Sequence, residues 1–467
     1  MNSLRRLLRR GIPRLVCCAL VVVLAGCGRG AGPAEEADAP ESEADLMARA
    51  RGIHERVITL DTHVDIPGNF GTPGVSDAGE MTGSKVNLPK MREGGLDTVF
   101  FIAFVGQPQA DDWGLNEEGY AAALEAAMRK INGIHRFTEE MRPDEIGLAT
   151  SAADVERIAG EGKLVATIGI ENGYPMGEDL SLIATFKELG AGYMGITHTG
   201  HNQLGDAHSP ADQPLHGGLS ELGRQAVAEM NRQGIMVDVS HAGRQTTLEV
   251  MELSLAPIIA SHSGVQAVRD VTRNLSDEEL LALKENGGVA QMVALGNYVE
   301  DTSERSTAMQ ALREELGIRG GRGGGGARGG GGRGGGGGGG RGGRGTAAEM
   351  TDEERQAQQE AQAEFARRVA EEIDPQFPAA NVQDFVDHID YAVNLIGIEH
   401  VGISSDFDGG GGIVGWNDAT ETFNVTLELV KRGYSEEEIA KIWSGNLLRV
   451  WGEVEEVAQR LQAEGGR

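Results

Sequence analysis

The chain has 467 residues, of which 40% are hydrophobic, and a formal net charge of -29. This length allows one large barrel or two to three ordinary domains with a sizeable core. The acidic balance excludes nucleic acid as a favoured partner, because an acidic surface repels phosphate backbones. All three cysteines, Cys17, Cys18 and Cys27, lie near the N-terminus. The body of the chain therefore has no internal disulfide, thiolate metal site or cysteine nucleophile.

The N-terminus has the pattern of an export signal. Five arginines precede an apolar run at 15–25, which is too short to span a bilayer comfortably. The run ends in Leu24-Ala25-Gly26-Cys27 and resembles a bacterial lipobox. We expect residues 1–26 to be a lipoprotein signal peptide, with an ordinary secretory signal or an uncleaved anchor as the alternatives. A lipid on Cys27 would attach the protein to a membrane on the exported side of the cell envelope. Residues 27–45 are predicted to be a flexible tether.

The next part of the chain alternates short apolar runs with amphipathic segments. The helical segments include 120–140, 219–233 and 246–255. Eight apolar, β-branched runs are expected to be strands: 57–61, 98–104, 164–170, 192–197, 234–239, 257–261, 288–295 and 400–404. This alternation favours an α/β fold, a (β/α)8 TIM barrel over residues 46–467. A doubly wound open sheet would predict a Gly-rich phosphate loop after an early strand, and the sequence has none.

One segment departs from this alternation. Residues 317–345 are almost only Gly and Arg, so they bury no apolar surface. We expect a disordered insertion at 317–347, between the seventh and eighth strands, followed by a solvated helix at 351–373. A tract of this composition can bind RNA, but a flexible insertion is the favoured interpretation for an exported acidic protein.

Polar residues gather where the predicted strands end. They are His63 and Asp65 after the first strand, Glu171 after the third, His198, His241 and His262 at the fourth, fifth and sixth, and Asp406 at the eighth. In a TIM barrel these ends surround one opening, which carries the active site. So many polar groups would repel one another or stay unsatisfied without a cation. The sequence therefore predicts a metal site, and its ligand types favour Zn, Mn, Fe or Co.

The other histidines are given structural interpretations. His201, His208 and His216 follow the fourth strand and are expected to be loop or surface residues. The four others, His54, His135, His388 and His400, fall on predicted helices or strand starts.

Several motifs resemble, in order and approximate spacing, those of the membrane dipeptidase (renal dipeptidase) family. They are His63-Val64-Asp65, Glu171, Thr197-His198-Thr199, Ser240-His241, Ser261-His262-Ser263, Arg273-Asn274 and Asp406-Phe407-Asp408-Gly409. The resemblance covers about residues 46–456, apart from the Gly/Arg insertion. The segment after His198 and the strand around 99–101 depart from the family pattern.

The resemblance implies a TIM barrel of the metal-dependent hydrolase type that holds two zinc ions, or other divalent ions. His63 and Asp65 would bind one ion, His241 and His262 the other, and Glu171 both. A hydroxide shared by the ions would hydrolyse the amide bond of a free dipeptide.

The same resemblance implies roles for the remaining residues. His198 would stabilise the oxyanion and Asp406 would transfer the proton. Arg273 and Tyr298 would bind the substrate's C-terminal carboxylate.

Two other functions stay open at this stage. One is a binuclear amidohydrolase acting on lactones, cyclic amides or phosphotriesters, since fold does not fix substrate. Such enzymes bridge their metals with a modified lysine on the fourth strand, whereas here that strand has no lysine and the third ends in Glu171. The other is a non-catalytic lipoprotein that binds peptides, which loss of Asp406 or of a ligand would have supported. The sequence is also compatible with a homodimer.

Overall fold

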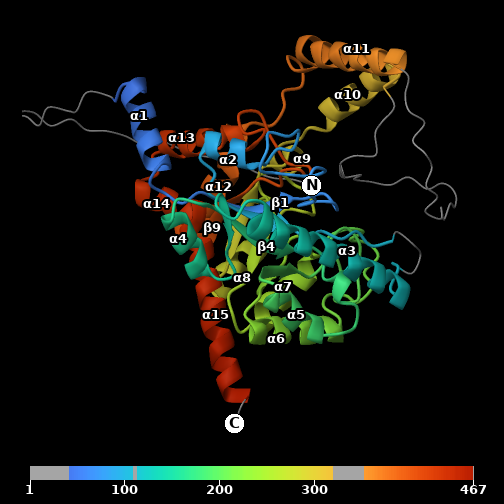
Figure 1. The fold of residues 1–467 in the computed structure, drawn as a ribbon, viewed down its shortest axis with the longest axis vertical. Coiled ribbons are helices and arrows are strands. Elements are labelled where there is room, and N and C mark those ends of the chain that lie inside the picture. The colour runs from blue at the N-terminus through green and yellow to red at the C-terminus, as the bar shows by residue number, and fades with distance from the viewer. Residues whose placement is uncertain (1–40, 109–112, 319–351, 466–467) are drawn as a thin grey trace, which may run out of the picture. The chain divides into compact units, whose positions relative to one another are not determined.

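The structure is a computed structural model that describes residues 41–108, 113–318 and 352–465. The described residues from Glu43 onward form one compact unit (Figure 1). The predicted signal peptide, Cys27, residues 27–40 of the tether and residues 319–347 of the insertion lie outside the described residues. Among the described helices, none combines the length and apolar character needed to cross a membrane.

Parallel strands form a barrel. They are β1 (Leu60–Asp65), β2 (Thr98–Ile102), β3 (Ile146–Leu148), β4 (Leu164–Ile170), β5 (Ala191–Gly195), β6 (Met236–Asp238), β7 (Ile259–Ser263), β8 (Val289–Val293) and β9 (Val401–Ser404). Their order is β1-β2-β4-β5-β6-β7-β8-β9, with β3 paired to β4 off this path. The ends of the path meet where the Asp65 amide donates to the Phe407 carbonyl at 2.9 Å. The predicted (β/α)8 barrel is confirmed.

The strand ends differ from the prediction at two important places. β1 and β7 continue past the predicted ends at 61 and 261, to Asp65 and Ser263, so His63 and Asp65, predicted to follow their strand, lie within it. The apolar pattern stops earlier, because the last residues of these strands are polar and find partners inside the barrel. β3 was not predicted, since three residues, Ile-Gly-Leu, are too short to produce a pattern.

Helices cover the outside of the barrel and connect its strands (Figure 1). The α-helices are α1 (Glu43–His54), α2 (Leu88–Gly94), α3 (Glu117–Arg136), α4 (Ala152–Gly160), α5 (Ser181–Glu188), α6 (Glu221–Gln233), α7 (Arg244–Leu253), α8 (Asp277–Asn286), α9 (Gly296–Val299), α10 (Ser303–Glu315), α11 (Asp352–Arg368), α12 (Val382–Ile396), α13 (Phe423–Lys431), α14 (Glu436–Ala440) and α15 (Asn446–Gly465). The short helices are η1 (Phe137–Met141), η2 (Tyr174–Met176), η3 (Val369–Ile373), η4 (Ile398–His400), η5 (Ala419–Glu421) and η6 (Lys441–Gly445). Helices α10 and α11 lie side by side, joined by the Arg368–Glu315 ion pair at 2.6 Å.

The apolar core has two main parts. The larger part lies between the strands and the surrounding helices. The other is formed by residues at the beginnings of strands, such as Leu60, Ile259 and Val289, packed against the buried face of α15. Within it the Trp451 ring lies 5.6 Å from the Phe100 ring. Helix α15 therefore closes the amino-terminal end of the barrel, and the polar strand ends occupy the opposite end.

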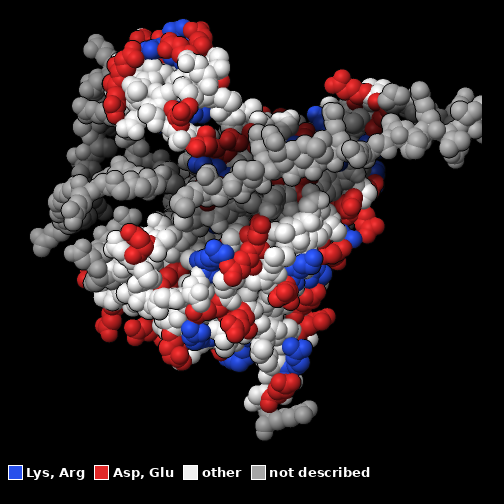
Figure 2. Space-filling model, turned by 180° about the vertical axis from the view of Figure 1, so that it is seen from behind, with Lys and Arg blue, Asp and Glu red and all other residues white. Residues whose placement is uncertain are grey.

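Acidic and basic side chains are interspersed on the face of the molecule shown in Figure 2. Acidic side chains are spread over most of the described surface, and basic ones are set among them. Charged side chains of the described residues also pair within single helices, as in Arg157 with Glu161 at 3.1 Å in α4 and Arg232 with Glu229 at 2.5 Å in α6. Exposed pairs of this kind contribute little to stability.

We expect replacement of Trp451 by Ala to destabilise the fold by about 3–5 kcal/mol, because it leaves a cavity at the closed end of the barrel. Denaturant unfolding monitored by circular dichroism measures the change. Arg460→Ala, on the exposed side of the same helix, is the matched control and should stay within about 0.5 kcal/mol of the unmodified chain. Equal losses in both variants would contradict this account of α15.

Candidate active site

Glu171 stands at the centre of the open end of the barrel. It directly follows β4, is 3% exposed, and faces histidines from four other strands or strand ends. Its carboxylate oxygens lie 3.0 Å from His241 Nε2, 3.3 Å from His262 Nε2, 3.6 Å from His63 Nε2 and 3.7 Å from His198 Nε2. We call these five residues the Glu171 cluster. The structure thus brings together side chains that lie far apart in the sequence.

Two further carboxylates adjoin the cluster on the β1 side. Asp65 Oδ2 lies 3.7 Å and Asp406 Oδ1 3.8 Å from His63 Nε2. The ligand atoms of three sets fall within 4.8 Å of one another: His63, Glu171 and His262; Glu171, His198 and His241; His63, Asp65 and Asp406. All five predicted metal ligands belong to these sets, and so do the two predicted catalytic residues.

The donor atoms fit divalent cations. His63 Nε2 is buried and has no hydrogen-bond partner among the described residues. His241 Nε2 and His262 Nε2 lie 2.9 Å apart while both also face Glu171. Buried lone pairs that converge in this way are costly unless a cation satisfies them. Nitrogen and oxygen donors without thiolate suit zinc and similar ions.

Hydrogen bonds behind the cluster fix the tautomers of two histidines. The Tyr193 hydroxyl donates to the Thr62 carbonyl at 3.0 Å, so its oxygen accepts from His63 Nδ1 at 3.1 Å. This leaves the lone pair on His63 Nε2, which faces the cluster. Partners of this kind orient metal-binding histidines.

His262 is held by a similar chain of hydrogen bonds. The Ser261 hydroxyl donates to Asp238 Oδ2 at 2.7 Å, so it accepts from His262 Nδ1 at 2.8 Å. The carboxylate of Asp238 is buried and also accepts the backbone amides of Ser240 and Ser261. His262 therefore also presents Nε2 as an acceptor.

The electrostatics of the cluster favour neutral imidazoles on one side. Burial, together with the nearby positive charges, lowers the pKa values of His241 and His262 well below their ordinary range. Burial opposes ionisation of Glu171, but the surrounding histidines hold its pKa well below the usual value. A neutral imidazole and an ionised carboxylate are the forms that bind metal.

The pKa of His63 is shifted in the opposite direction to those of His241 and His262. Although burial alone would lower its pKa, Glu171 and Asp65 raise the pKa well above the ordinary value. The carboxylates of Asp65, Glu171 and Asp406 favour a positive charge near His63 Nε2. A divalent ion can supply this charge in place of a proton. Burial raises the pKa of Asp406 to about 8, which suits a group that exchanges protons near neutral pH.

Two residues of the site have left-handed backbone conformations. His241 has a φ of 69° and Asp406 a φ of 56°. Such conformations cost about 1–3 kcal/mol each and are found where function requires them. A side chain at Gly409 would overlap with the carboxylates of Asp65 and Asp406, so this turn requires glycine. The loop is anchored by Asp408, which accepts the Lys85 amide at 3.0 Å.

Arg273 is buried beside the cluster. It is 4% exposed, and donates to the Ser263 hydroxyl at 2.8 Å and to the His262 carbonyl at 2.7 Å. Its guanidinium lies 5.6 Å from the centre of the Tyr298 ring, the other predicted carboxylate-binding residue. Its Nε has no hydrogen-bond partner among the described residues. A partly unsatisfied cation therefore adjoins the candidate metal site.

The sequence interpretation missed some neighbours of the site. His201 and His208 lie in the loop after β5, as predicted, but both adjoin the site. His201 is 1% exposed and accepts the Ala207 amide at 3.0 Å, and the His208 ring lies 5.9 Å from that of His241. Lys130 on α3 also approaches the opening, where its amine lies 5.7 Å from the Phe104 ring. No local pattern marks these residues, because only the fold brings them here.

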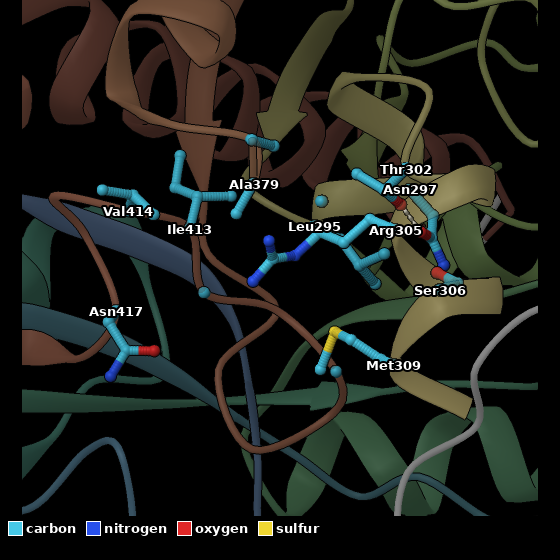
Figure 3. Close-up of a pocket in the computed structure, with 14 residues that line it drawn as sticks. Leu295, Asn297, Thr302, Arg305, Ser306, Met309, Ala379, Ile413, Val414 and Asn417 are labelled. Carbon is cyan, nitrogen blue, oxygen red and sulfur yellow. Dashed lines mark hydrogen bonds between the residues drawn. The ribbon is translucent and has the colours of Figure 1, made fainter. Parts of the chain in front are cut away.

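An open pocket of about 420 Å³ lies beside the Asp406 loop, with the Arg305 side chain among the residues directed into it (Figure 3). Its walls come from α9, α10 and the segment that follows Gly410. None of the predicted ligands lines it, so it is a neighbour of the site rather than part of it.

Known proteins share this sequence and fold. The sequence profile of the membrane dipeptidase family (peptidase family M19) matches residues 47–465. Dipeptidase aclJ of Aspergillus oryzae is 30% identical over 442 residues, covering 90% of this chain and 86% of that protein. The probable dipeptidase PvdM from Pseudomonas aeruginosa is 32% identical with a TM-score of 0.70, and the match covers 89% of this chain and 100% of that one.

A metallo peptidase from Rhodobacter sphaeroides, liganded with a phosphinate mimic of the dipeptide L-Ala-D-Ala, has the same fold. It is 23% identical with a TM-score of 0.60, and the match covers 85% of this chain and 99% of that one.

The barrel and its carboxylate–imidazole site define a metal-dependent hydrolase. The chain belongs to the membrane dipeptidase family, peptidase family M19, and is an enzyme of the metallo-dipeptidase class. The family expected from the motifs is confirmed.

We expect the purified full chain to contain about two divalent ions, as binuclear hydrolases do. His262→Ala should lose at least one of them, because it removes an Nε2 donor from the Glu171 cluster. Metal content by inductively coupled plasma mass spectrometry checks this. The control is His135→Ala, on α3, where the imidazole pairs with Glu139 instead. Full activity of a metal-free protein would contradict the site.

Proposed function

We propose that this chain is a zinc-dependent dipeptidase that hydrolyses the amide bond of free dipeptides. The observation that carries the proposal is the buried guanidinium of Arg273 beside the Glu171 cluster. A metal site and a fixed cation at one opening match a short substrate with an amide and a nearby carboxylate. The dipeptide mimic bound to the related metallo peptidase supports this substrate class.

The metal-binding roles follow the family pattern. We assign His63 and Asp65 to one ion and His241 and His262 to the other, with Glu171 shared. When bound, the two ions supply ionised water at neutral pH and polarise the scissile carbonyl.

Substrate orientation falls to residues around the cluster. Arg273 and Tyr298 bind the terminal carboxylate, for which a planar guanidinium is well suited. The side chain of His198 is 26% exposed and packs against the Phe104 ring at 4.5 Å, so its imidazole can reach substrate. It donates a hydrogen bond to the oxygen on which negative charge develops.

Proton transfer is assigned to Asp406. Its carboxyl group is buried, with its side chain 9% exposed, and adjoins both His63 and the proposed position of the amide. It takes a proton from the attacking water and delivers it to the leaving nitrogen. β5 has the sequence Ala-Gly-Tyr-Met-Gly, so it offers no lysine to bridge metals as in other binuclear amidohydrolases.

Asp406→Asn keeps the size of the side chain but removes its proton-accepting group. We expect kcat for a dipeptide such as L-Ala-L-Ala to fall by at least ~10²-fold, with metal content retained. Steady-state kinetics and metal analysis on the same preparation test this. Asp408→Asn is the matched control, because the Asp408 carboxylate accepts the Lys85 amide and belongs to none of the candidate metal-ligand sets. Unchanged kcat in Asp406→Asn would assign proton transfer to another group.

Arg273→Ala should lower kcat/KM for free dipeptides by at least ~10-fold, because a charge-assisted bond to the carboxylate is lost. Dipeptides with an amidated C-terminus should be poor substrates for both forms. A panel of free and amidated dipeptides separates the two effects. Arg269→Ala, in the same loop but paired with Asp301, is the control. Equal rates on free and amidated substrates, or lactone hydrolysis without dipeptide cleavage, would overturn the dipeptidase proposal.

A further inference from the structure

We propose that Lys130 determines substrate specificity by binding an anionic side chain on the N-terminal residue of the dipeptide. This assignment rests on the proposed dipeptidase function and specifies its substrate class. It predicts a preference for dipeptides that begin with Glu or Asp.

Lys130 lies half-buried on α3. Its ammonium makes no hydrogen bond or ion pair with any other described residue, and it lies 5.7 Å from the centre of the Phe104 ring. The Phe104 ring in turn lies 4.5 Å from the His198 ring. Lys130 therefore stands one aromatic ring away from the Glu171 cluster.

Other half-buried lysines of the chain are satisfied. Lys85 donates to the Asn417 carbonyl at 2.6 Å, Lys90 to the Ser84 carbonyl at 2.7 Å and Lys187 to the Gly234 carbonyl at 3.0 Å. Burial lowers the pKa of Lys130, while the charges of Asp65 and Glu171 act in the opposite direction. A partly desolvated ammonium with three unused donors favours an incoming anion.

The position of Lys130 indicates which part of the substrate it meets. In the barrel order β1-β2-β4-β5-β6-β7-β8-β9, β2 and β7 stand on opposite sides. Phe104 and Lys130 follow β2, whereas Arg273 is hydrogen-bonded to the His262 carbonyl in β7. A dipeptide with its carboxylate on Arg273 and its amide over the cluster thus directs its N-terminal residue towards Lys130.

The chemistry of that residue follows from the charge. The free amino group of a dipeptide is a cation, so Lys130 repels it rather than binds it. A side-chain carboxylate complements the ammonium, and the methylene groups before it can pack on the Phe104 ring. Gln has the shape of Glu without its charge, which makes the pair L-Glu-L-Ala and L-Gln-L-Ala a direct probe.

The experiment compares kcat/KM for these two dipeptides in the unmodified chain, Lys130→Met, Lys130→Arg and Arg129→Met. We expect the unmodified chain to prefer L-Glu-L-Ala by about tenfold or more, the effect of one charge-assisted bond. Lys130→Met should bring the ratio to about one, with L-Gln-L-Ala turnover within about twofold and metal content unchanged. Lys130→Arg should keep the preference. Arg129→Met should behave like the unmodified chain, because Arg129 is exposed and paired with Glu125.

Each contrary result has a distinct meaning. Equal rates on both dipeptides in the unmodified chain would overturn the role of Lys130 and leave the dipeptidase proposal intact. A similar loss on both dipeptides in Lys130→Met would show that Lys130 supports the fold or the site without selecting substrate, which also overturns the assignment. Cleavage of neither dipeptide, nor of any other dipeptide, would overturn the proposed function itself.

Discussion

The buried carboxylate of Glu171 is the constraint on which the rest of the structure depends. Four imidazole nitrogens face it from 3.0 to 3.7 Å, and none of their side chains could be placed there by local structure alone. An arrangement of this density is stable only if charge is balanced and lone pairs are satisfied. The closed barrel of parallel strands brings these residues together, because the strand ends converge from all sides on one point.

Residues behind the Glu171 cluster determine how its histidines are oriented. Asp238 accepts hydrogen bonds from Ser240 and Ser261, and through Ser261 it determines which nitrogen of His262 faces inwards. Arg273 also donates hydrogen bonds to the Ser263 hydroxyl and the His262 carbonyl, both in β7. The proposed metal ligand His262 and the proposed carboxylate-binding residue Arg273 therefore share one hydrogen-bonded framework.

The sequence was sufficient for the barrel and for the members of the candidate site, because both follow from a simple rule. Apolar runs give the strands, and polar residues at their ends meet at the opening. The rule failed where polar residues continue a strand, as at His63 and His262, and where a strand is as short as β3. It also could not reveal Lys130 or His208. Their proximity depends on the direction of a helix and the path of a loop, which leave no periodic signal.

Tyr193 belongs to two parts of the molecule at once. Its ring packs in the inner core, 5.2 Å from Phe100, and its hydroxyl binds both Thr62 and His63. Core packing and ligand orientation are thus thermodynamically linked through one side chain. An ion bound at the opening would stabilise the folded state by mass action, and a core substitution that moves the Tyr193 hydroxyl would also move a hydrogen-bond partner of His63. Substitutions in the barrel interior that displace Tyr193 would therefore change metal affinity as well as stability.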